Sequence, residues 1–256
     1  MGSLSIFRKI GFSAVVASLG VVSAAEAASV RFDSLEAVFQ NATGGSNIVQ
    51  TISYGDPASI RWGVTNGGPQ SGYDFDAQDT PFTRVQDTVF GLGEFTHHNF
   101  PIGRNTGITS VELFVRANIV SVPDAGPDVS LGTSIFKFLI KHEETHNVAP
   151  CPYPGTSVCD DRVSISTLTS SDSVLIDGIN YTLSILGFSE TLADANNGIF
   201  NADFLSPEGG SNTRVLAATF AVDDRNIAPV PLPAGLPLLL ASLGVLGLVR
   251  KRSKGA

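Results

Sequence analysis

The sequence has few basic residues away from its two ends. Of 16 Lys and Arg residues, six lie within the first nine or the last seven positions, and the segment 28–229 keeps 10 basic against 23 acidic residues. Its formal charge is therefore near −13. Affinity for nucleic acid comes mainly from Lys and Arg that neutralise phosphates, so this composition excludes nucleic acid as a partner. It suits an exported soluble protein or one that meets divalent cations.

Several motifs that mark catalysis are also missing. The sequence contains no Gly-x-Ser-x-Gly elbow, no Walker loop and no dinucleotide-binding fingerprint. It has no apparent internal repeat and no long low-complexity segment. The large families of nucleotide-binding and serine-hydrolase enzymes therefore have no support in this sequence.

The C-terminal end, in contrast, carries a tail of three parts. Prolines at 231 and 233 keep the first part extended and open to a processing enzyme, because proline is poorly tolerated in helices. An apolar run follows, and its 16 residues from 234 to 249 span about 24 Å as a helix, against a hydrocarbon core of roughly 30 Å. A basic stop on the cytoplasmic side ends it. An ordinary membrane anchor is one interpretation, and a transient anchor that is cut is the one we favour. The sorting motif is Val230, Pro231, Leu232, Pro233 and Ala234, and the basic stop is Arg250, Lys251 and Arg252.

This tail resembles the PEP-CTERM sorting signal of Gram-negative bacteria, in its Val-Pro-Leu-Pro-Ala form. The resemblance implies processing by an exosortase, a membrane cysteine protease, and sorting to the cell surface or biofilm matrix in step with exopolysaccharide. Leu232 stands where the Pro-Glu-Pro form has Glu. That difference concerns the class of processing enzyme and not the class of signal.

The N-terminal end predicts export by the same route. Arg8 and Lys9 form a positive segment, the apolar run 10–22 follows, and Ala25-Glu26-Ala27 provides a small-x-small cleavage site. We expect a signal peptide at 1–27, a single exported domain at 28–229 and the sorting tail at 230–256.

Between the two ends, short apolar or alternating runs are interrupted by Gly, Asn, Asp and Pro. Thr, Val, Ile and Phe favour a pleated, half-buried surface, and helical periodicity is weak. The pattern predicts an all-β fold, a single β-sandwich of jelly-roll or immunoglobulin-like type, and leaves its topology open. Strands are expected at 48–54, 59–63, 89–99, 108–119, 134–142, 162–168, 178–186 and 214–222, and short helices at 34–40 and 192–196.

One polar motif lies at the end of the predicted strand 89–99. On a strand, His97 and Asn99 face one side, and Thr96 and His98 face the other. The functional interpretation is a polar patch or a histidine ligand. The structural interpretation, which the chemistry favours, is a network in which His97 and Asn99 satisfy backbone groups before Pro101 ends the ladder.

The same segment resembles the signature of the THxN family of PEP-CTERM proteins. The resemblance rests on Thr96, His97 and Asn99, with Pro101 and Ile102 behind them. Together with the tail it covers most of the chain. It implies export and sorting, but no activity.

A second motif, His142-Glu143-Glu144-Thr145-His146, matches the zincin pattern His-Glu-x-x-His. That chemistry needs a helix, which places both His on one face and the Glu beside a zinc-bound water. Here a strand-like run precedes the motif and three prolines follow it, so we expect extended chain, in which the two His lie about 13 Å apart. The match is then a coincidence of spacing. The family resemblance offers another parse, His142-x-Glu144-Thr145-x-Asn147, in which His146 stands where Pro is expected.

The only two cysteines, Cys151 and Cys159, lie eight positions apart. In an exported domain they are expected to form a disulfide. The alternative is a zinc site that combines them with His142 and His146.

Two acidic groups and one aromatic residue complete the candidates. Asp74, Asp76 and Asp79 are expected in one loop, and Asp160 with Asp161 in another. Such carboxylates suit Ca²⁺, but their spacing is not that of an EF-hand, so solvated acidic turns are the expectation. The single Trp is expected in the core, with a sugar platform as the alternative.

The sequence thus predicts a non-enzymatic exported protein of the cell surface or extracellular matrix, with no cofactor and no metal. Its expected partners are an exosortase-type enzyme, the inner membrane in transit, and exopolysaccharide. The alternatives are a zinc-dependent hydrolase at 142–146 and a module that binds carbohydrate or calcium.

Overall fold

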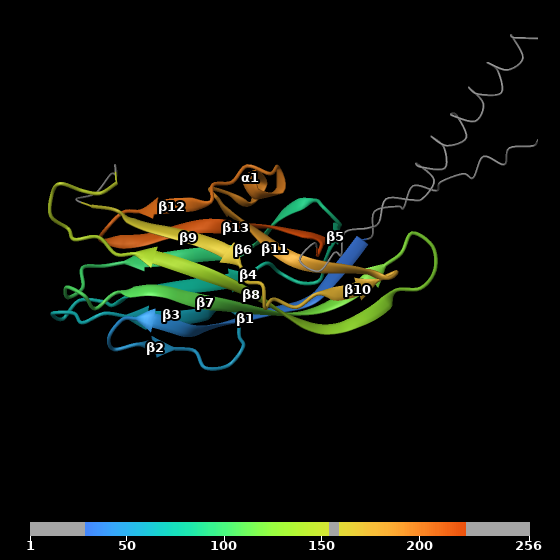
Figure 1. Cartoon of the computed structure of the whole chain (residues 1–256), viewed down its shortest axis with the longest axis horizontal. Helices are drawn as coiled ribbons and strands as arrows, with labels where there is room; N and C mark the ends of the chain where they lie inside the picture. Colours follow the sequence, from blue (N-terminus) through green and yellow to red (C-terminus); the bar gives the residue numbers. More distant parts are fainter. Residues whose placement is uncertain (1–28, 154–158, 224–256) are drawn as a thin grey trace, which may run out of the picture.

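The computed structural model describes residues 29–153 and 159–223, which form an all-β structure as the sequence predicts (Figure 1). The predicted signal peptide and sorting tail lie outside these residues. Within the described ranges, the single α-helix is α1 (Leu192–Asn196), and no helix has the length and apolar character to cross a membrane.

The strands form two antiparallel sheets. In spatial order, the six-stranded sheet consists of β12 (Asp203–Ser206), β9 (Asp161–Thr167), β8 (Val129–Glu143), β7 (Ile108–Val122), β1 (Ser29–Gly44) and β5 (Phe82–Val85). The seven-stranded sheet consists of β10 (Val174–Ile176), β11 (Ile179–Ser189), β13 (Gly210–Val222), β6 (Val89–Asn99), β4 (Ser71–Ala77), β3 (Ala58–Trp62) and β2 (Val49–Gln50).

One hydrophobic core takes side chains from both sheets. On β8, Phe136, Phe138 and Ile140 alternate with less buried neighbours, as a strand with one buried face requires. Aromatic rings of the two sheets contact each other directly, since the ring centroids of Phe95 on β6 and Phe204 on β12 lie 6.4 Å apart. Each fully buried side chain of this size stabilises the fold by about 1.5–3 kcal/mol. Polar side chains inside this core therefore need a specific explanation.

The predicted elements agree with the structure most closely where the pattern is local. Strand 89–99 and helix 192–196 have the predicted bounds, whereas 48–54 contributes only β2. The helix expected at 34–40 is wrong, because this segment belongs to β1 and pairs with β7 from Ser34 to Gln40. Continuous pairing with β7 overrides a short helical preference. Strands β4, β5, β10 and β12 were not predicted.

Candidate functional site

The inward face of β6 becomes polar at its C-terminal end. His97 and Asn99 are buried, and Thr96 and His98 are half-buried, which is the predicted alternation. Nδ1 of His97 lies 2.7 Å from Oγ of Ser206, and Nδ2 of Asn99 donates a 2.8 Å hydrogen bond to the Ser206 carbonyl. The motif therefore contacts the end of β12, a strand of the opposite sheet. Asn99 satisfies a backbone group as the structural interpretation expected, whereas the same expectation is wrong for His97, whose Nδ1 contacts a side-chain hydroxyl.

The His-Glu-x-x-His segment is not helical. Strand β8 includes His142 and Glu143, and the chain then leaves the sheet without forming a helix at 144–147. The side chain of His142 is fully buried, whereas His146 is exposed. A zincin needs both imidazoles on one helical face. The geometry required by the zinc-hydrolase alternative is therefore absent from this described segment.

His142 instead meets His97 between the two sheets. Their ring centroids lie 5.1 Å apart, with the planes nearly perpendicular at 84°. Two aromatic residues of the seven-stranded sheet pack against them. Oη of Tyr73 lies 2.6 Å from Nδ1 of His142, and the Trp62 ring centroid lies 5.3 Å from that of His142. Trp62 is 0% exposed, so it is a core residue and offers no platform for a sugar.

Three carboxylates surround this histidine pair: Asp161 at the start of β9, Glu144 after β8, and Glu208 between β12 and β13. Nε2 of His142 lies 3.1 Å from Oε2 of Glu144 and 3.8 Å from Oδ2 of Asp161. The expectation that Asp160 and Asp161 lie in a solvated turn is wrong, because both residues are buried and the Asp161 side chain is 0% exposed. Asp161 begins β9 and pairs with Ser206 of β12, and this register places it at the buried end of the six-stranded sheet.

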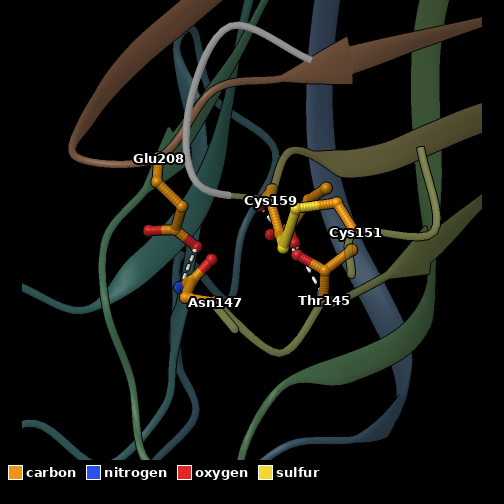
Figure 2. The surroundings of a disulfide bond; sticks show 6 residues. Thr145, Asn147, Cys151, Cys159 and Glu208 are labelled. Atoms are coloured by element: carbon orange, nitrogen blue, oxygen red, sulfur yellow. Dashed lines mark hydrogen bonds between the residues drawn. A yellow bond between two sulfur atoms is a disulfide. The ribbon is translucent and has the colours of Figure 1, made fainter. Parts of the chain in front are cut away.

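The loop that follows β8 donates hydrogen bonds to two of these carboxylates, and Figure 2 shows the bond from Asn147 to Glu208. The Thr145 amide donates a 2.7 Å hydrogen bond to Oδ1 of Asp161, and Nδ2 of Asn147 donates a 2.8 Å bond to Oε1 of Glu208. The Thr145 hydroxyl donates to the Cys159 carbonyl at 2.8 Å, beside the disulfide that joins Cys159 to Cys151. The alternative zinc site with both cysteines is therefore wrong for this structure, since its two thiolates are not available.

The inward residues of the two sequence motifs thus converge. Thr96 and His98 face the other side of β6, where Thr96 contacts Thr213 and His98 contacts Asp74. Two residues of the second motif also face elsewhere. Glu143 accepts a hydrogen bond from the Tyr153 hydroxyl, pairs with Arg162 at 3.6 Å and is exposed, as is His146. These are the two variable positions of the parse His142-x-Glu144-Thr145-x-Asn147. The other four positions all contact or belong to the polar cluster. We refer to His97, His142, Glu144, Asp161 and Glu208 as the inter-sheet cluster.

Burial controls the protonation of the inter-sheet cluster. Desolvation lowers the pKa of His142 to about 4, and desolvation together with the neighbouring histidines lowers the pKa of His97 well below its usual value. Desolvation, followed by repulsion from Glu144, raises the pKa of Asp161 to about 7, and desolvation with repulsion from Glu208 raises that of Glu144 to about 7. Burial also raises the pKa of Glu208. Both histidines are therefore neutral at pH 7.

Among the described residues, no Lys or Arg forms an ion pair with the carboxylates of the inter-sheet cluster. The ion pairs of Lys and Arg in that part of the chain involve other acids. A cleft of about 610 Å³, lined in part by His142, Glu144 and Thr145, opens beside the cluster. Glu144, with its side chain 22% exposed, lies at the boundary between this cleft and the interior. Two neutral imidazoles and several carboxylates in one buried place are a donor set for a cation.

The other predicted acidic group forms no comparable cluster. Asp74 and Asp76 lie on β4, so their assignment to a loop is wrong. Asp74 accepts two hydrogen bonds from Arg61, at 2.7 and 2.8 Å, and lies 2.7 Å from Nε2 of His98. Within the described ranges, Asp74, Asp76 and Asp79 do not converge as a set of metal ligands. This acidic group is consequently part of an ion-pair network on β4 and its neighbours.

Sequence reasoning missed three members of the site: Tyr73, Ser206 and Glu208. Tyr73 lies within β4, Ser206 ends β12, and Glu208 lies in the turn before β13, and no local pattern connects these three positions to the histidines. Asp161 offered one signal, since it shares a period-two face with the buried Val163. That alternation predicts a buried side chain for Asp161 and not one in a solvated turn.

No protein-family model matches this chain, and no curated protein has a similar sequence. Function is therefore inferred from the site and from the two ends of the sequence.

Proposed function

We propose that this chain is an exported, non-enzymatic protein of the cell surface or extracellular matrix, processed by an exosortase-type enzyme. The observation that carries the proposal is the C-terminal tail, with its proline-rich motif at 230–234, its apolar run and its basic stop at 250–252. The signal-peptide pattern at 1–27 supports the same route. The tail holds the protein in the inner membrane until it is cut, and the protein then functions with exopolysaccharide at the surface.

In this proposal the exported domain, 28–229, is a single β-sandwich of jelly-roll or immunoglobulin-like type. Two antiparallel sheets that share one hydrophobic core support it. The disulfide between Cys151 and Cys159 agrees with an oxidising compartment. The absence of a zincin helix at 142–146 supports a role without catalysis, since the Glu of that motif acts only beside a metal held by both His.

The sorting step can be tested in the native host. Replacing 230–233 with Gly and Ser should leave the full-length protein in the inner membrane, because the processing enzyme loses its motif. The matched control replaces 224–227, just ahead of the motif, and should be processed normally. Fractionation with and without the exosortase, with mass spectrometry of both termini, provides the measurement. Normal cleavage and release of the 230–233 variant would show that the tail is not a sorting signal.

The non-enzymatic half of the proposal has a separate test. Glu143 is exposed and paired with Arg162, so Glu143→Gln should change no hydrolysis of casein or peptides. Glu190→Gln, which alters another exposed acid, is the control. Cleavage that wild type and Glu190→Gln share and Glu143→Gln abolishes would identify the chain as a hydrolase.

A further inference from the structure

Three buried atoms in the inter-sheet cluster have no hydrogen-bond partner among the described residues: Nε2 of His97, Oδ2 of Asp161 and Oε2 of Glu208. The other polar atom of each side chain has a hydrogen-bond partner. His97 contacts Ser206, Asp161 accepts from the Thr145 amide, and Glu208 accepts from Asn147. His97 and Asp161 are both 0% exposed, so neither unpartnered atom is compensated by bulk water. A buried polar group without a partner costs about 1–3 kcal/mol, and more when it is charged.

The metal-ligating atoms of the inter-sheet cluster form two close groups that share Asp161. The ligand atoms of His97, His142 and Asp161 are all within 4.8 Å of each other, and so are those of Asp161, Glu144 and Glu208. A tetrahedral zinc ion, with ligands at about 2.0–2.1 Å, separates neighbouring ligand atoms by about 3.3 Å. Nε2 of His142 lies 3.1 Å from Oε2 of Glu144 and 3.8 Å from Oδ2 of Asp161. One of these distances is slightly shorter and the other slightly longer than the tetrahedral separation.

We propose that His97, His142 and Asp161 bind one divalent transition-metal ion between the two sheets, with Glu144 as the fourth ligand and zinc as the ion that best fits this donor set. Two imidazoles disfavour Ca²⁺ and Mg²⁺, which prefer oxygen ligands alone. Two carboxylates match the double charge of the ion. The proposal does not depend on export or on the exosortase.

The surrounding residues have the arrangement of a second ligand shell. Tyr73 contacts Nδ1 of His142 at 2.6 Å and Ser206 contacts Nδ1 of His97 at 2.7 Å. When each Nδ1 carries the proton, both Nε2 lone pairs are directed to the ion, as in metal sites whose histidines donate their other N–H to a neighbour. The Thr145 amide orients Asp161 in the same way.

The position of the ion implies a structural role. His97 belongs to the seven-stranded sheet, whereas His142 and Asp161 belong to the six-stranded sheet. Four protein ligands close the coordination sphere, which distinguishes structural zinc from catalytic zinc with its open position. The ion therefore joins the two sheets at the end where β6 and β8 finish and β9 begins.

The experiment uses the protein as the native host produces it, purified in detergent without a polyhistidine tag, stripped with EDTA and dialysed after addition of zinc sulfate. Metal content is measured by mass spectrometry and the melting temperature by circular dichroism. Wild type should retain one zinc per chain. Its melting temperature should rise by about 10 °C when free zinc is roughly 1,000 times Kd.

The variants Asp161→Asn and His97→Gln should retain less than a tenth of this zinc and lose the thermal shift. Asp161→Asn keeps the oxygen that accepts from Thr145, and the amide of His97→Gln can still reach Ser206, so both preserve their outer contact. His146→Gln is the matched control, because it removes the exposed histidine of the zincin-like motif and should bind zinc as wild type does.

X-ray absorption on wild type decides the matter even if a variant does not fold. The proposal expects only nitrogen and oxygen ligands at about 2.0–2.1 Å. Sulfur at about 2.3 Å would place the metal on the cysteines and overturn the proposal. So would wild type with less than a tenth of a zinc per chain, or folded Asp161→Asn and His97→Gln that keep a full zinc.

Discussion

The four histidines of this chain occupy two kinds of surroundings, although they occur as two close pairs in the sequence. His97 and His142 are buried and meet between the sheets, whereas His98 is half-buried and His146 is exposed. Strand alternation separates His97 from His98 on the basis of sequence alone. It cannot separate His142 from His146, because the chain leaves β8 between them. The zincin-like spacing therefore groups the wrong residues.

At the same scale, Asp74 shows what a paired carboxylate contributes. Partial burial by itself raises the pKa of its carboxyl, but hydrogen bonds from Arg61 and His98 outweigh it and hold that pKa below the usual value. A carboxyl whose pKa is lower in the folded state stabilises the protein above its unfolded pKa of about 3.9. This stabilisation is lost as the pH falls through the folded pKa.

We predict that Asp74→Asn lowers the free energy of unfolding by about 1–2 kcal/mol at pH 7, because it removes the charge from a two-pronged bond with Arg61. The difference from wild type should shrink as the pH falls below about 4, where wild-type Asp74 itself becomes protonated. Urea denaturation at several pH values measures both effects. Asp79→Asn, at an exposed position, should change stability by less than about 0.5 kcal/mol and serves as the control. An equal loss at pH 7 and pH 3 would contradict the role assigned to the charge.

At the scale of elements, strand pairing decides what isolated segments leave ambiguous. The residues at 34–40 have a mixed pattern that fits a short helix, yet they form the middle of β1 and pair with β7 along their whole length. Close packing between strands also restricts side chains at particular positions. A Cβ added to Gly93 of β6 would lie 2.4 Å from the Asp76 carbonyl and 2.9 Å from the Ala77 Cα on β4. Backbone atoms of a neighbouring strand cannot move away as a flexible side chain can.

We therefore predict that Gly93→Ala destabilises the protein by about 1–3 kcal/mol, since it separates β4 from β6. Gly210→Ala on β13 is the matched control, because its added Cβ meets nothing within 4 Å, and it should cost less than about 0.5 kcal/mol. Denaturant midpoints of the two variants and wild type make the comparison. Similar midpoints for the two variants would mean that β4 and β6 accommodate the methyl group at Gly93 without loss of stability.

At the scale of the whole molecule, the two sheets are connected by polar contacts at one end and by apolar packing elsewhere. The core cluster extends through both sheets, while the inter-sheet cluster and the disulfide lie where β8 ends and β9 begins. The disulfide closes the loop between these two strands, and Thr145 connects it to Asp161 through hydrogen bonds to both segments.

We predict that non-reducing peptide mapping of the protein from its native host finds one peptide pair linked through Cys151 and Cys159. Reduction should cost at most about 3 kcal/mol of stability, because the closed loop is short. Replacing both cysteines with Ser should reproduce this loss, whereas Ser replacement of an exposed residue such as Thr109 should not. Two free thiols in this protein would contradict the prediction.

The sequence by itself determined the fold class, the bounds of the most regular elements and the inward direction of His97 and Asn99. Each of these follows from local chemistry: residue preference, a period of two and turn residues. The two ends of the sequence also carry the whole case for export and sorting, since such signals are recognised as linear segments. Only the tertiary structure brought His97, His142, Asp161, Glu144 and Glu208 together. They come from strands or turns of both sheets, and their proximity depends on strand order and register, which depend on contacts between residues far apart in the chain. Local pattern contains no information on those contacts, so a pair of motifs 45 residues apart, at His97 and His142, became one site only through folding.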